Sequence, residues 1–375
     1  MTDCQLDNGL IPTSVPEYHV FPPKWRDSIE WGSSGVLMPW QEYKATGDVE
    51  ALRRNYPMMQ RYVAHITSMA KGGIAARGIG DWSGKTAIID KSPGLISTAF
   101  YYEDAQVLAK SAKLLGNNAE AATEQLLADT IRAAFNAAFF HPDTNQYGTG
   151  SQAANSFALD LGLVQPPNRA AVLDNLLGDL KDRNYAMTVG EIGLPYMLRA
   201  LASAGRSDIV YAINNQTDHP GYGYQLKMGA TALCETWDAN RDNCQIQLIL
   251  GDIVEWFFHD LAGIELEFDR PGYSHIIIHP TPVGDLTEVK ASDDSVRGKI
   301  VSEWKRSGEH VILQVSIPPN TTATVNIPAS SRESVTEGGK PAAEVAGVNF
   351  LQMSGSYAQY EIGSGDYTFG VLCRQ

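Results

Sequence analysis

The chain has 375 residues, 43% of them hydrophobic, and a formal net charge of -14 at pH 7. This length allows a large core and favours two domains. An acidic surface argues against nucleic acid and anionic membranes as partners and suits a neutral ligand. No stretch approaches the ~18 apolar residues that a membrane span needs, and the polar segment 1–9 is unlike a secretory leader. We therefore expect a soluble protein, either secreted or cytoplasmic.

Apolar residues recur at helical spacing from the start of the chain to about residue 264. Short connections between the helices indicate antiparallel helical hairpins. One connection, Lys71–Pro93, is far longer and has no apolar period, which is typical of a functional or disordered loop. The predicted helices are Val49–Ala70, Leu95–Leu115, Ala119–Phe140, Arg169–Asp182, Ile192–Ala204, Ser207–Asn215 and Ile246–Ala262.

After Ile264 the sequence changes to short β-rich runs separated by Gly, Pro and Asn. The pattern predicts an antiparallel β-sandwich, so the domains are expected at 1–264 and 265–375. The predicted strands are Tyr273–His279, Val296–Trp304, His310–Ile317 and Ala323–Ile327. The cysteines at 4, 234, 244 and 373 match no zinc spacing, and we expect no metal site and no cofactor.

The segment Gly223–Asp238 places one carboxylate, Glu235, between small residues and aromatic flanks. Tyr222, Tyr224 and Trp237 supply flat apolar faces on which sugars stack. Desolvation by such neighbours suits a carboxyl group to proton transfer. The alternative is a structural glutamate paired with an arginine between helices, and the segment alone does not separate the two.

A series of short motifs, taken in chain order, resembles the α-L-rhamnosidases of glycoside hydrolase family 78. The resemblance implies a mainly α fold, a six-hairpin (α/α)6 toroid followed by a C-terminal antiparallel β-sandwich. The motifs are Pro16-Glu17-Tyr18, Arg26–Gly32, Pro39-Trp40, Tyr56–Met59, Gly80-Asp81-Trp82, Gly150-Ser151-Gln152, Gly190-Glu191-Ile192-Gly193, Pro220–Trp237, Glu255-Trp256-Phe257, Leu261–Ile264 and Pro271-Gly272-Tyr273.

The resemblance also implies an inverting glycosidase acting on a rhamnose-containing glycoside. In such enzymes one carboxyl group protonates the leaving oxygen and a second activates water, about 6.5–9.5 Å away. By similarity Glu235 is the general base, and Asp81, Trp82 and Trp31 line the rhamnose subsite. Trp31 as core packing and Asp81 as a turn cap are the alternatives. The further substrate-binding residues expected are Glu191, Trp237 and Gln247.

The sequence departs from the family pattern at three positions. The acidic motif that carries the family's general acid lies upstream of the region that aligns with Met1, so we expect an N-terminally truncated toroid. Gln247 stands where the family has a histidine, and glutamine cannot titrate. Glu191 stands where close relatives prefer aspartate.

Three hypotheses follow: a truncated family-78 glycosidase, a sugar-binding remnant without the acid, and an inert fragment that needs a partner chain. An incomplete toroid is expected to expose apolar side chains and to self-associate. The candidates for that exposure are Val36-Leu37-Met38 with Trp40, and Leu248, Ile249, Ile253, Trp256 and Phe257.

Overall fold

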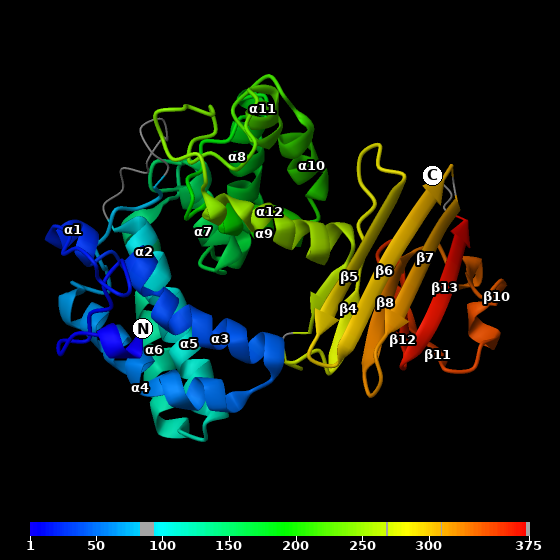
Figure 1. Ribbon diagram of the computed structural model, residues 1–375, viewed down its shortest axis with the longest axis horizontal. Coiled ribbons are helices and arrows are strands. Elements are labelled where there is room, and N and C mark those ends of the chain that lie inside the picture. The colour runs from blue at the N-terminus through cyan, green and yellow to red at the C-terminus, as the bar shows by residue number, and fades with distance from the viewer. Residues whose placement is uncertain (83–93, 268, 309, 373–375) are drawn as a thin grey trace. The chain divides into compact units, whose positions relative to one another are not determined.

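The computed structural model describes residues 1–82, 94–267, 269–308 and 310–372. Cys373 and residues 83–93 of the predicted long loop lie outside this part. The chain forms two compact units, Met1–Trp40 with Val49–Asp252 and Gln41–Asp48 with Ile253–Gln375. The first unit is helical and the second is mainly β (Figure 1). Across the described residues, the helices are all too short or too polar to cross a membrane.

Helical hairpins make up the first unit. A two-stranded hairpin, β1 (Phe140–His141) and β2 (Gln146–Tyr147), follows α6. A 3-10 turn, Leu248–Asp252, closes the unit. Its helices are α1 (Pro23–Arg26), α2 (Ile29–Gly32), α3 (Ser34–Thr46, which continues into the second unit), α4 (Val49–Met69), α5 (Leu95–Leu114), α6 (Asn118–Phe139), α7 (Gln152–Asp160), α8 (Arg169–Asp182), α9 (Leu194–Ser203), α10 (Ser207–Asn215) and α11 (Tyr222–Lys227).

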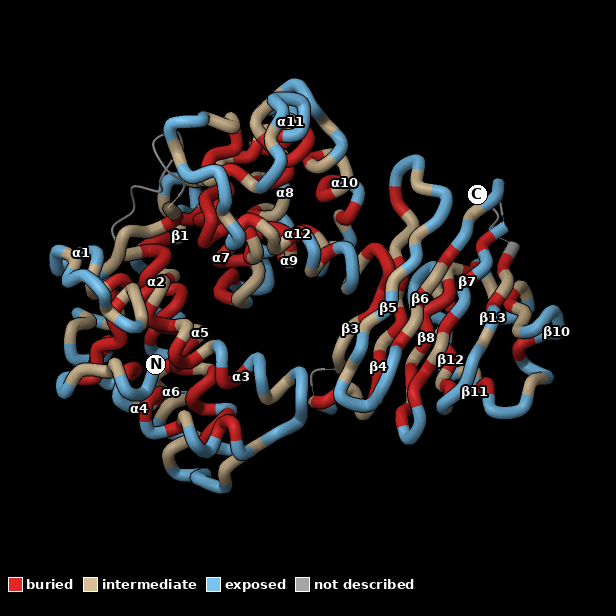
Figure 2. The backbone as a smooth tube through the Cα atoms, viewed as in Figure 1, coloured by how far each residue is buried: buried red, intermediate tan, exposed pale blue. Residues whose placement is uncertain are grey.

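The hairpins have an inner and an outer helix. Helices α5, α7 and α9 each pack on the helix that follows them, and α7 also contacts both α5 and α9. Every residue of α7 from Gln152 to Leu159 is buried. By contrast α6 buries only Ala128, Ile131, Phe135 and Phe139, a single stripe at helical spacing. A helix that is buried on several sides lies inside, so α5 and α7 form the inner layer (Figure 2).

Two stacked sheets make up the β unit (Figure 1). One has the order β10-β9-β13-β7-β6-β5 and the other β11-β12-β8-β4-β3. All pairs are antiparallel except β4 with β8, which pair in parallel, so the predicted antiparallel sandwich is correct apart from that pair. The strands are β3 (Ile264–Leu266), β4 (His275–Ile278), β5 (Glu288–Ser295), β6 (Gly298–Ser307), β7 (His310–Ile317), β8 (Thr322–Pro328), β9 (Val335–Glu337), β10 (Lys340–Pro341), β11 (Val348–Ser354), β12 (Tyr357–Ile362) and β13 (Gly365–Leu372).

The core between the sheets comes from alternation along the strands. Val311, Leu313, Val315 and Ile317 of β7 are all buried, and the residues between them are not. Trp304 of β6 is 1% exposed, and its indole N–H donates to the Leu261 carbonyl at 2.8 Å. A buried Trp thus satisfies its polar group as well as filling the core.

The predicted helix over Ile246–Ala262 is wrong. The structure has a 3-10 turn over Leu248–Asp252, one α-turn (α12) over Ile253–Trp256 and a π-turn over Phe257–Leu261. The residues at the start are engaged elsewhere, because the backbone N–H of Gln247 donates to the Leu233 carbonyl at 2.8 Å. Ile246 and Gln247 therefore belong to a loop that contacts the Leu233 segment, and helical structure begins only at Leu248.

Candidate active site

Glu235 is held by two hydrogen-bond donors from separate segments. The indole Nε1–H of Trp82 donates to Oε1 at 2.9 Å, and the backbone N–H of Cys244 donates to Oε2 at 3.1 Å. The Glu235 N–H in turn donates to the Cys244 carbonyl at 2.9 Å. Within the described ranges no Lys or Arg forms an ion pair with Glu235, so the alternative of an arginine-paired carboxylate has no partner there.

The tripeptide Gly80-Asp81-Trp82, called here the Trp82 segment, is fixed at each of its residues. The Gly80 N–H donates to Glu30 Oε1 at 3.1 Å. Asp81 accepts from the Gly190 N–H at 2.5 Å and from the Gly193 N–H at 2.7 Å, one at each carboxylate oxygen. The Trp82 carbonyl accepts from the Glu191 N–H at 2.7 Å. Helix α2 and the loop 190–193 therefore meet at this segment.

Glycines make this close approach between loops possible. A Cβ at Gly190 would lie 2.5 Å from the Trp82 carbonyl oxygen and 2.7 Å from Asp81 Oδ1. A Cβ at Gly78, whose φ is +136°, would lie 2.1 Å from Glu30 Oε2. Because real Cβ atoms do not approach this closely, both positions require glycine for steric reasons. This explains Gly190 of its motif and Gly78, two residues before the Trp82 segment.

Glu191 lies beside Glu235 as a second carboxyl group. Its side chain accepts a hydrogen bond from the Gln247 amide, and it is 3% exposed. Burial raises the pKa of Glu191 to about 7, the Gln247 hydrogen bond opposes that shift, and the nearby charges of Glu235 and Asp81 add to it. Near neutral pH this carboxyl group is therefore partly protonated.

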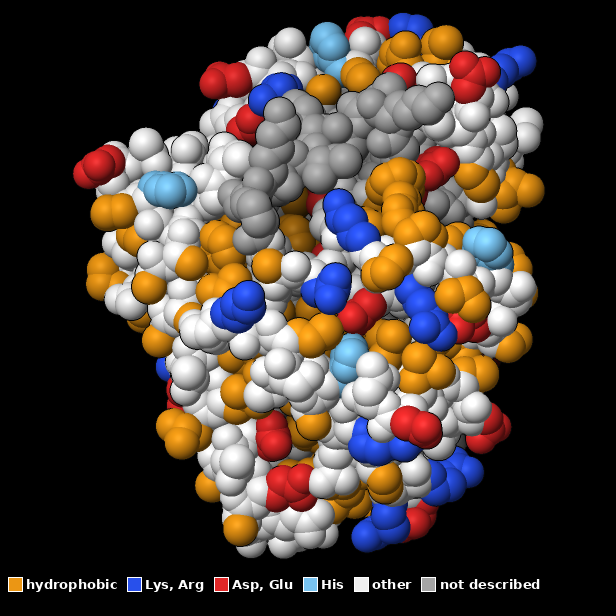
Figure 3. Space-filling model, turned by 90° about the vertical axis from the view of Figure 1, so that its left-hand side faces the viewer, with side chains coloured by type: hydrophobic (Ala, Val, Ile, Leu, Met, Phe, Trp, Pro, Cys, Tyr) orange, Lys and Arg blue, Asp and Glu red, His pale blue; other side chains and the backbone are white. Residues whose placement is uncertain are grey.

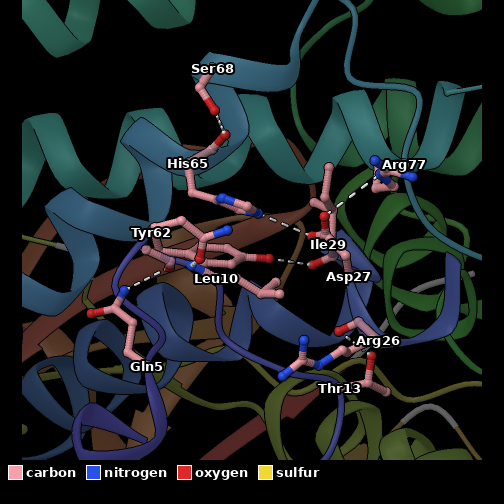
Figure 4. A network of polar contacts seen from close by, with 12 residues as sticks. Gln5, Leu10, Thr13, Arg26, Asp27, Ile29, Tyr62, His65, Ser68 and Arg77 are labelled. Carbon is pink, nitrogen blue, oxygen red and sulfur yellow. Dashed lines mark hydrogen bonds and ion pairs between the residues drawn. The ribbon is translucent and has the colours of Figure 1, made fainter. Parts of the chain in front are cut away.

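Buried polar side chains around Glu30 contact the Trp82 segment. Glu30 of α2 accepts from the Ser28 hydroxyl at 2.7 Å and from the Ser97 hydroxyl at 3.0 Å, besides the Gly80 N–H. Burial raises the pKa of Glu30. Just before α2, Asp27 contacts His65 Nε2 at 3.2 Å and Arg77 Nε at 3.6 Å (Figure 4). The segment that leads to Trp82 is thus tied to α2 and α4.

The predicted aromatic residues occupy different environments. Trp237 is 4% exposed, packs edge-on against Tyr222 with ring centroids 5.0 Å apart, and donates its indole N–H to the Val189 carbonyl at 2.7 Å. Trp31 is half-buried in α2, and in the described part of the chain its ring contacts neither Trp82 nor any other ring. Trp25 of α1 is the aromatic neighbour of Trp82, with centroids 4.9 Å apart. The structure thus brings Glu235, Trp82, Asp81, Glu191 and Gln247 together.

A cavity of about 430 Å³ adjoins the Glu235 segment. It is lined by residues 228–232 together with Cys234, Ala239, Arg241 and Gln245. Cys234, which lines the cavity, directly precedes Glu235 in the sequence. The cavity therefore adjoins the candidate base without being lined by it. Where the structure describes the chain, it forms no cluster of three or more His, Cys, Asp or Glu side chains able to hold a metal ion.

Sequence reasoning missed three contributors to this site. Glu30 and Trp25 fall within or next to a recognised motif, but nothing local assigns them a role. The third is the Cys244 backbone N–H, which no residue type can signal. The spacing Gly78-x-Gly80 was an available clue, because paired glycines before an aspartate often mark close backbone approach.

Two family models match almost the whole helical and β sequence. Residues 1–261 match the bacterial alpha-L-rhamnosidase 6 hairpin glycosidase domain, and residues 263–342 match the bacterial alpha-L-rhamnosidase C-terminal domain. Among curated proteins, an alpha-L-rhamnosidase of Streptomyces avermitilis is 30% identical over 91% of this chain and 33% of its own length. One from Formosa agariphila is 31% identical over 89% of this chain and 37% of its own length. The chain spans about a third of the length of these relatives.

Solved structures agree with the family models. The Streptomyces avermitilis alpha-L-rhamnosidase complexed with L-rhamnose is similar with a TM-score of 0.89 and 28% identity, over 99% of this chain and 35% of that one. The alpha-L-rhamnosidase from Dictyoglumus thermophilum is similar with a TM-score of 0.90 and 29% identity, over 99% and 42%. With the first family model spanning residues 1–261, this chain belongs to the bacterial α-L-rhamnosidases of the six-hairpin glycosidase family.

Proposed function

We propose that this chain supplies part of the catalytic domain of an inverting glycoside hydrolase that releases terminal α-L-rhamnose, with Glu235 as the general base. The observation that carries the proposal is the Glu235 carboxylate, held by the Trp82 indole and the Cys244 N–H beside the buried carboxyl of Glu191. A carboxylate that fixed hydrogen-bond donors hold in one orientation is suited to take a proton from water.

In the proposed reaction Glu235 takes a proton from a water molecule as the water oxygen bonds to the anomeric carbon. The bond from that carbon to the leaving oxygen breaks on the opposite face, and a general acid protonates the leaving oxygen. Within the described residues we assign no general acid. Rate enhancement by general acid or base assistance is typically ~10²–10⁴-fold for each group.

The other residues fall into two groups by their contacts. Trp82 and Gln247 are proposed to contact the sugar, because they adjoin Glu235 and Glu191. Glu191 would donate a hydrogen bond to a sugar hydroxyl when it is protonated. Asp81 already accepts two backbone N–H groups, and Trp237 is buried, so both are proposed to support the site from beneath. We retain Trp31 as a second aromatic wall of the same subsite.

Replacing Glu235 with Gln tests the assignment of the base. The experiment uses the chain and a longer form that includes the upstream acid motif, with an aryl α-L-rhamnoside as substrate. The amide keeps the shape of the carboxylate but cannot take a proton, so we expect Glu235→Gln to abolish hydrolysis and to retain rhamnose binding by calorimetry. Near-normal turnover by this variant would place the base elsewhere. NMR of the rhamnose anomer that forms first tests whether the reaction inverts the anomeric configuration.

The sugar-binding alternative is separated by the same calorimetry. Rhamnose binding without hydrolysis in either form of the protein supports a remnant that holds the sugar but has no acid. If neither rhamnose binding nor hydrolysis is observed, the result supports a fragment that needs a partner chain. Hydrolysis that appears only with the upstream motif supports the enzyme.

A further inference from the structure

We propose that Trp82 is a positioning residue for Glu235, acting through its indole N–H, and that Glu30 and Asp81 hold Trp82 in place for that purpose. The hydrogen-bond geometry stands by itself, and its catalytic consequence rests on the proposed function of Glu235. An aromatic wall would need only the face of the ring. The ring edge that carries Nε1–H is the part aimed at the carboxylate.

A glutamate side chain has three rotatable bonds, so a base must be held in one orientation to be effective. In this chain the two donors that hold Glu235 come from different segments, one donor for each oxygen. Each carboxylate oxygen has two lone pairs and keeps one free to accept from water. The arrangement therefore restricts the carboxylate without blocking its use as a base.

Trp82 can fix Glu235 only if Trp82 is itself fixed. Three contacts at consecutive residues do this: Gly80 with Glu30, Asp81 with Gly190 and Gly193, and Trp82 with Glu191. Both acidic side chains in this set are buried, with Asp81 at 1% and Glu30 at 5% exposure. Among the described residues, Glu30 forms no ion pair.

Removing either acceptor leaves backbone N–H groups buried without a partner, which is costly. A buried carboxyl group without a cation, such as Glu30 in the described residues, is itself unfavourable, so its presence calls for a reason beyond stability. Holding a short segment rigid between α2 and the loop 190–193 is such a reason. Trp82→Phe keeps an apolar ring that can still pack against Trp25. The substitution removes the N–H donor to Glu235.

Indole N–H resonances test the contact on the chain as it exists. The chain has seven Trp, and the signal missing from the Trp82→Phe spectrum identifies Trp82. We expect that signal to shift in Glu235→Gln, because an N–H bonded to a carboxylate is sensitive to its charge. Trp304, in the other unit, donates to a backbone carbonyl and serves as an internal reference that does not move. A Trp82 signal unchanged by Glu235→Gln would overturn the proposal.

The anchor is tested by paired variants of Glu30. Gln at position 30 can still accept from the Gly80 N–H, whereas Ala cannot. We expect the Trp82 signal to stay in place in Glu30→Gln and to broaden or move in Glu30→Ala, with thermal melts showing that both variants are folded. If Glu30→Ala leaves the Trp82 signal unchanged, the anchoring role is wrong. If Glu30→Ala does not fold, Ser97→Ala takes its place in the test. This variant removes one hydrogen-bond donor to Glu30 and disturbs the fold less.

Kinetics of a longer form that includes the acid motif test the catalytic consequence. Loss of a hydrogen bond to a charged group should lower kcat of Trp82→Phe roughly 10- to 100-fold and leave KM nearly unchanged, because the ring face remains. Trp82→Ala should also raise KM. A Trp82→Phe variant that changes KM alone would make Trp82 a binding wall only. A Trp82 signal that responds to Glu235→Gln, in a protein whose longer form shows no hydrolysis, would instead contradict the proposed function and leave the contact intact.

Discussion

At the scale of single residues, Glu191 shows how burial and charge act together. The side chain is almost fully buried, accepts one amide hydrogen bond and faces two other carboxyl groups, Glu235 and Asp81. Each of these factors except the amide favours the neutral form. A pKa of about 7 in place of the ordinary 4.5 means that the folded chain holds a proton at pH 5–7 that the unfolded chain has lost.

This predicts that stability falls as pH rises. Below the ordinary value both states are protonated, and between it and about 7 the folded state binds more protons, so the free energy of unfolding decreases with pH in that window. The loss due to Glu191 is at most about 3 kcal/mol by pH 8. In Glu191→Gln the decrease between pH 5 and pH 8 should be smaller by that contribution.

Urea unfolding of both proteins at the two pH values measures the difference. Burial also raises the pKa of Glu265 to about 7 and that of Asp260 to about 6, so the native chain keeps part of its pH dependence in the variant. Glu265→Gln, in the other unit, should likewise reduce the decrease between pH 5 and pH 8, by the contribution of Glu265. An identical pH dependence in native and Glu191→Gln chains would mean that Glu191 is ionised in the folded state throughout.

At the scale of elements, the helices with a single apolar stripe were predictable and the connections that form the site were not. Arg169–Asp182 and Ser207–Asn215 have the predicted bounds, because an amphipathic helix leaves its period in the sequence. The strands β5 and β11 were not predicted, since β5 is exposed on alternate residues and carries charges there, and β11 is exposed over most of its length.

The site resisted prediction for a different reason. Its residues were found by resemblance, but their roles depend on backbone donors at Gly190, Gly193 and Cys244, and a backbone N–H has no residue type. The contacts along the Trp82 segment likewise depend on the loop 190–193, which lies close to it in the fold. A local sequence pattern describes one loop and does not indicate which other loop it contacts.

Two glycine variants test the meeting of these loops. Gly190→Ala places a Cβ 2.5 Å from the Trp82 carbonyl oxygen, a backbone atom that cannot move aside without the segment, so we expect a loss of about 1–3 kcal/mol. Gly178→Ala in the middle of α8 meets nothing within 4 Å and should stabilise the chain by about 0.5–1 kcal/mol.

Denaturation midpoints measure the expected loss of stability in Gly190→Ala and the expected gain in Gly178→Ala. The Trp82 indole resonance reports on the local contact. It should move in Gly190→Ala and remain in place in Gly178→Ala. If Gly190→Ala is neutral in stability and silent in that resonance, the loops do not meet as closely as described.

At the scale of the whole molecule, exposed apolar side chains are unevenly distributed. On the face in Figure 3 they lie in small groups among charged residues. The expected exposure is wrong for Val36, Trp40, Ile253 and Trp256, which are buried. It is right for Met38, Leu248, Ile249 and Phe257, at 60%, 83%, 36% and 42% exposed.

Within the helical unit, the segments around the candidate base carry further exposed apolar side chains. Leu226, Met228 and Ile246 are 73%, 50% and 68% exposed, and with Leu248 they flank the Glu235 segment on both sides in the sequence. The Gln247–Leu233 backbone contact ties the two flanks together. Apolar side chains exposed on two flanks that are tied to each other favour association with another surface.

We therefore predict that the 375-residue chain self-associates through these side chains. The double variant Leu226→Ser with Leu248→Ser should shift the sedimentation distribution toward a single monomer at the same concentration, because both side chains are largely exposed and their loss removes apolar surface without opening the core. Ile312→Ser with Leu351→Ser, two exposed positions on β7 and β11 in the other unit, is the matched control and should leave the distribution unchanged. Analytical ultracentrifugation of the three proteins decides the matter: a native chain that sediments as a monomer across the accessible concentrations contradicts the prediction, and an equal response to both double variants removes its assignment to the helical unit.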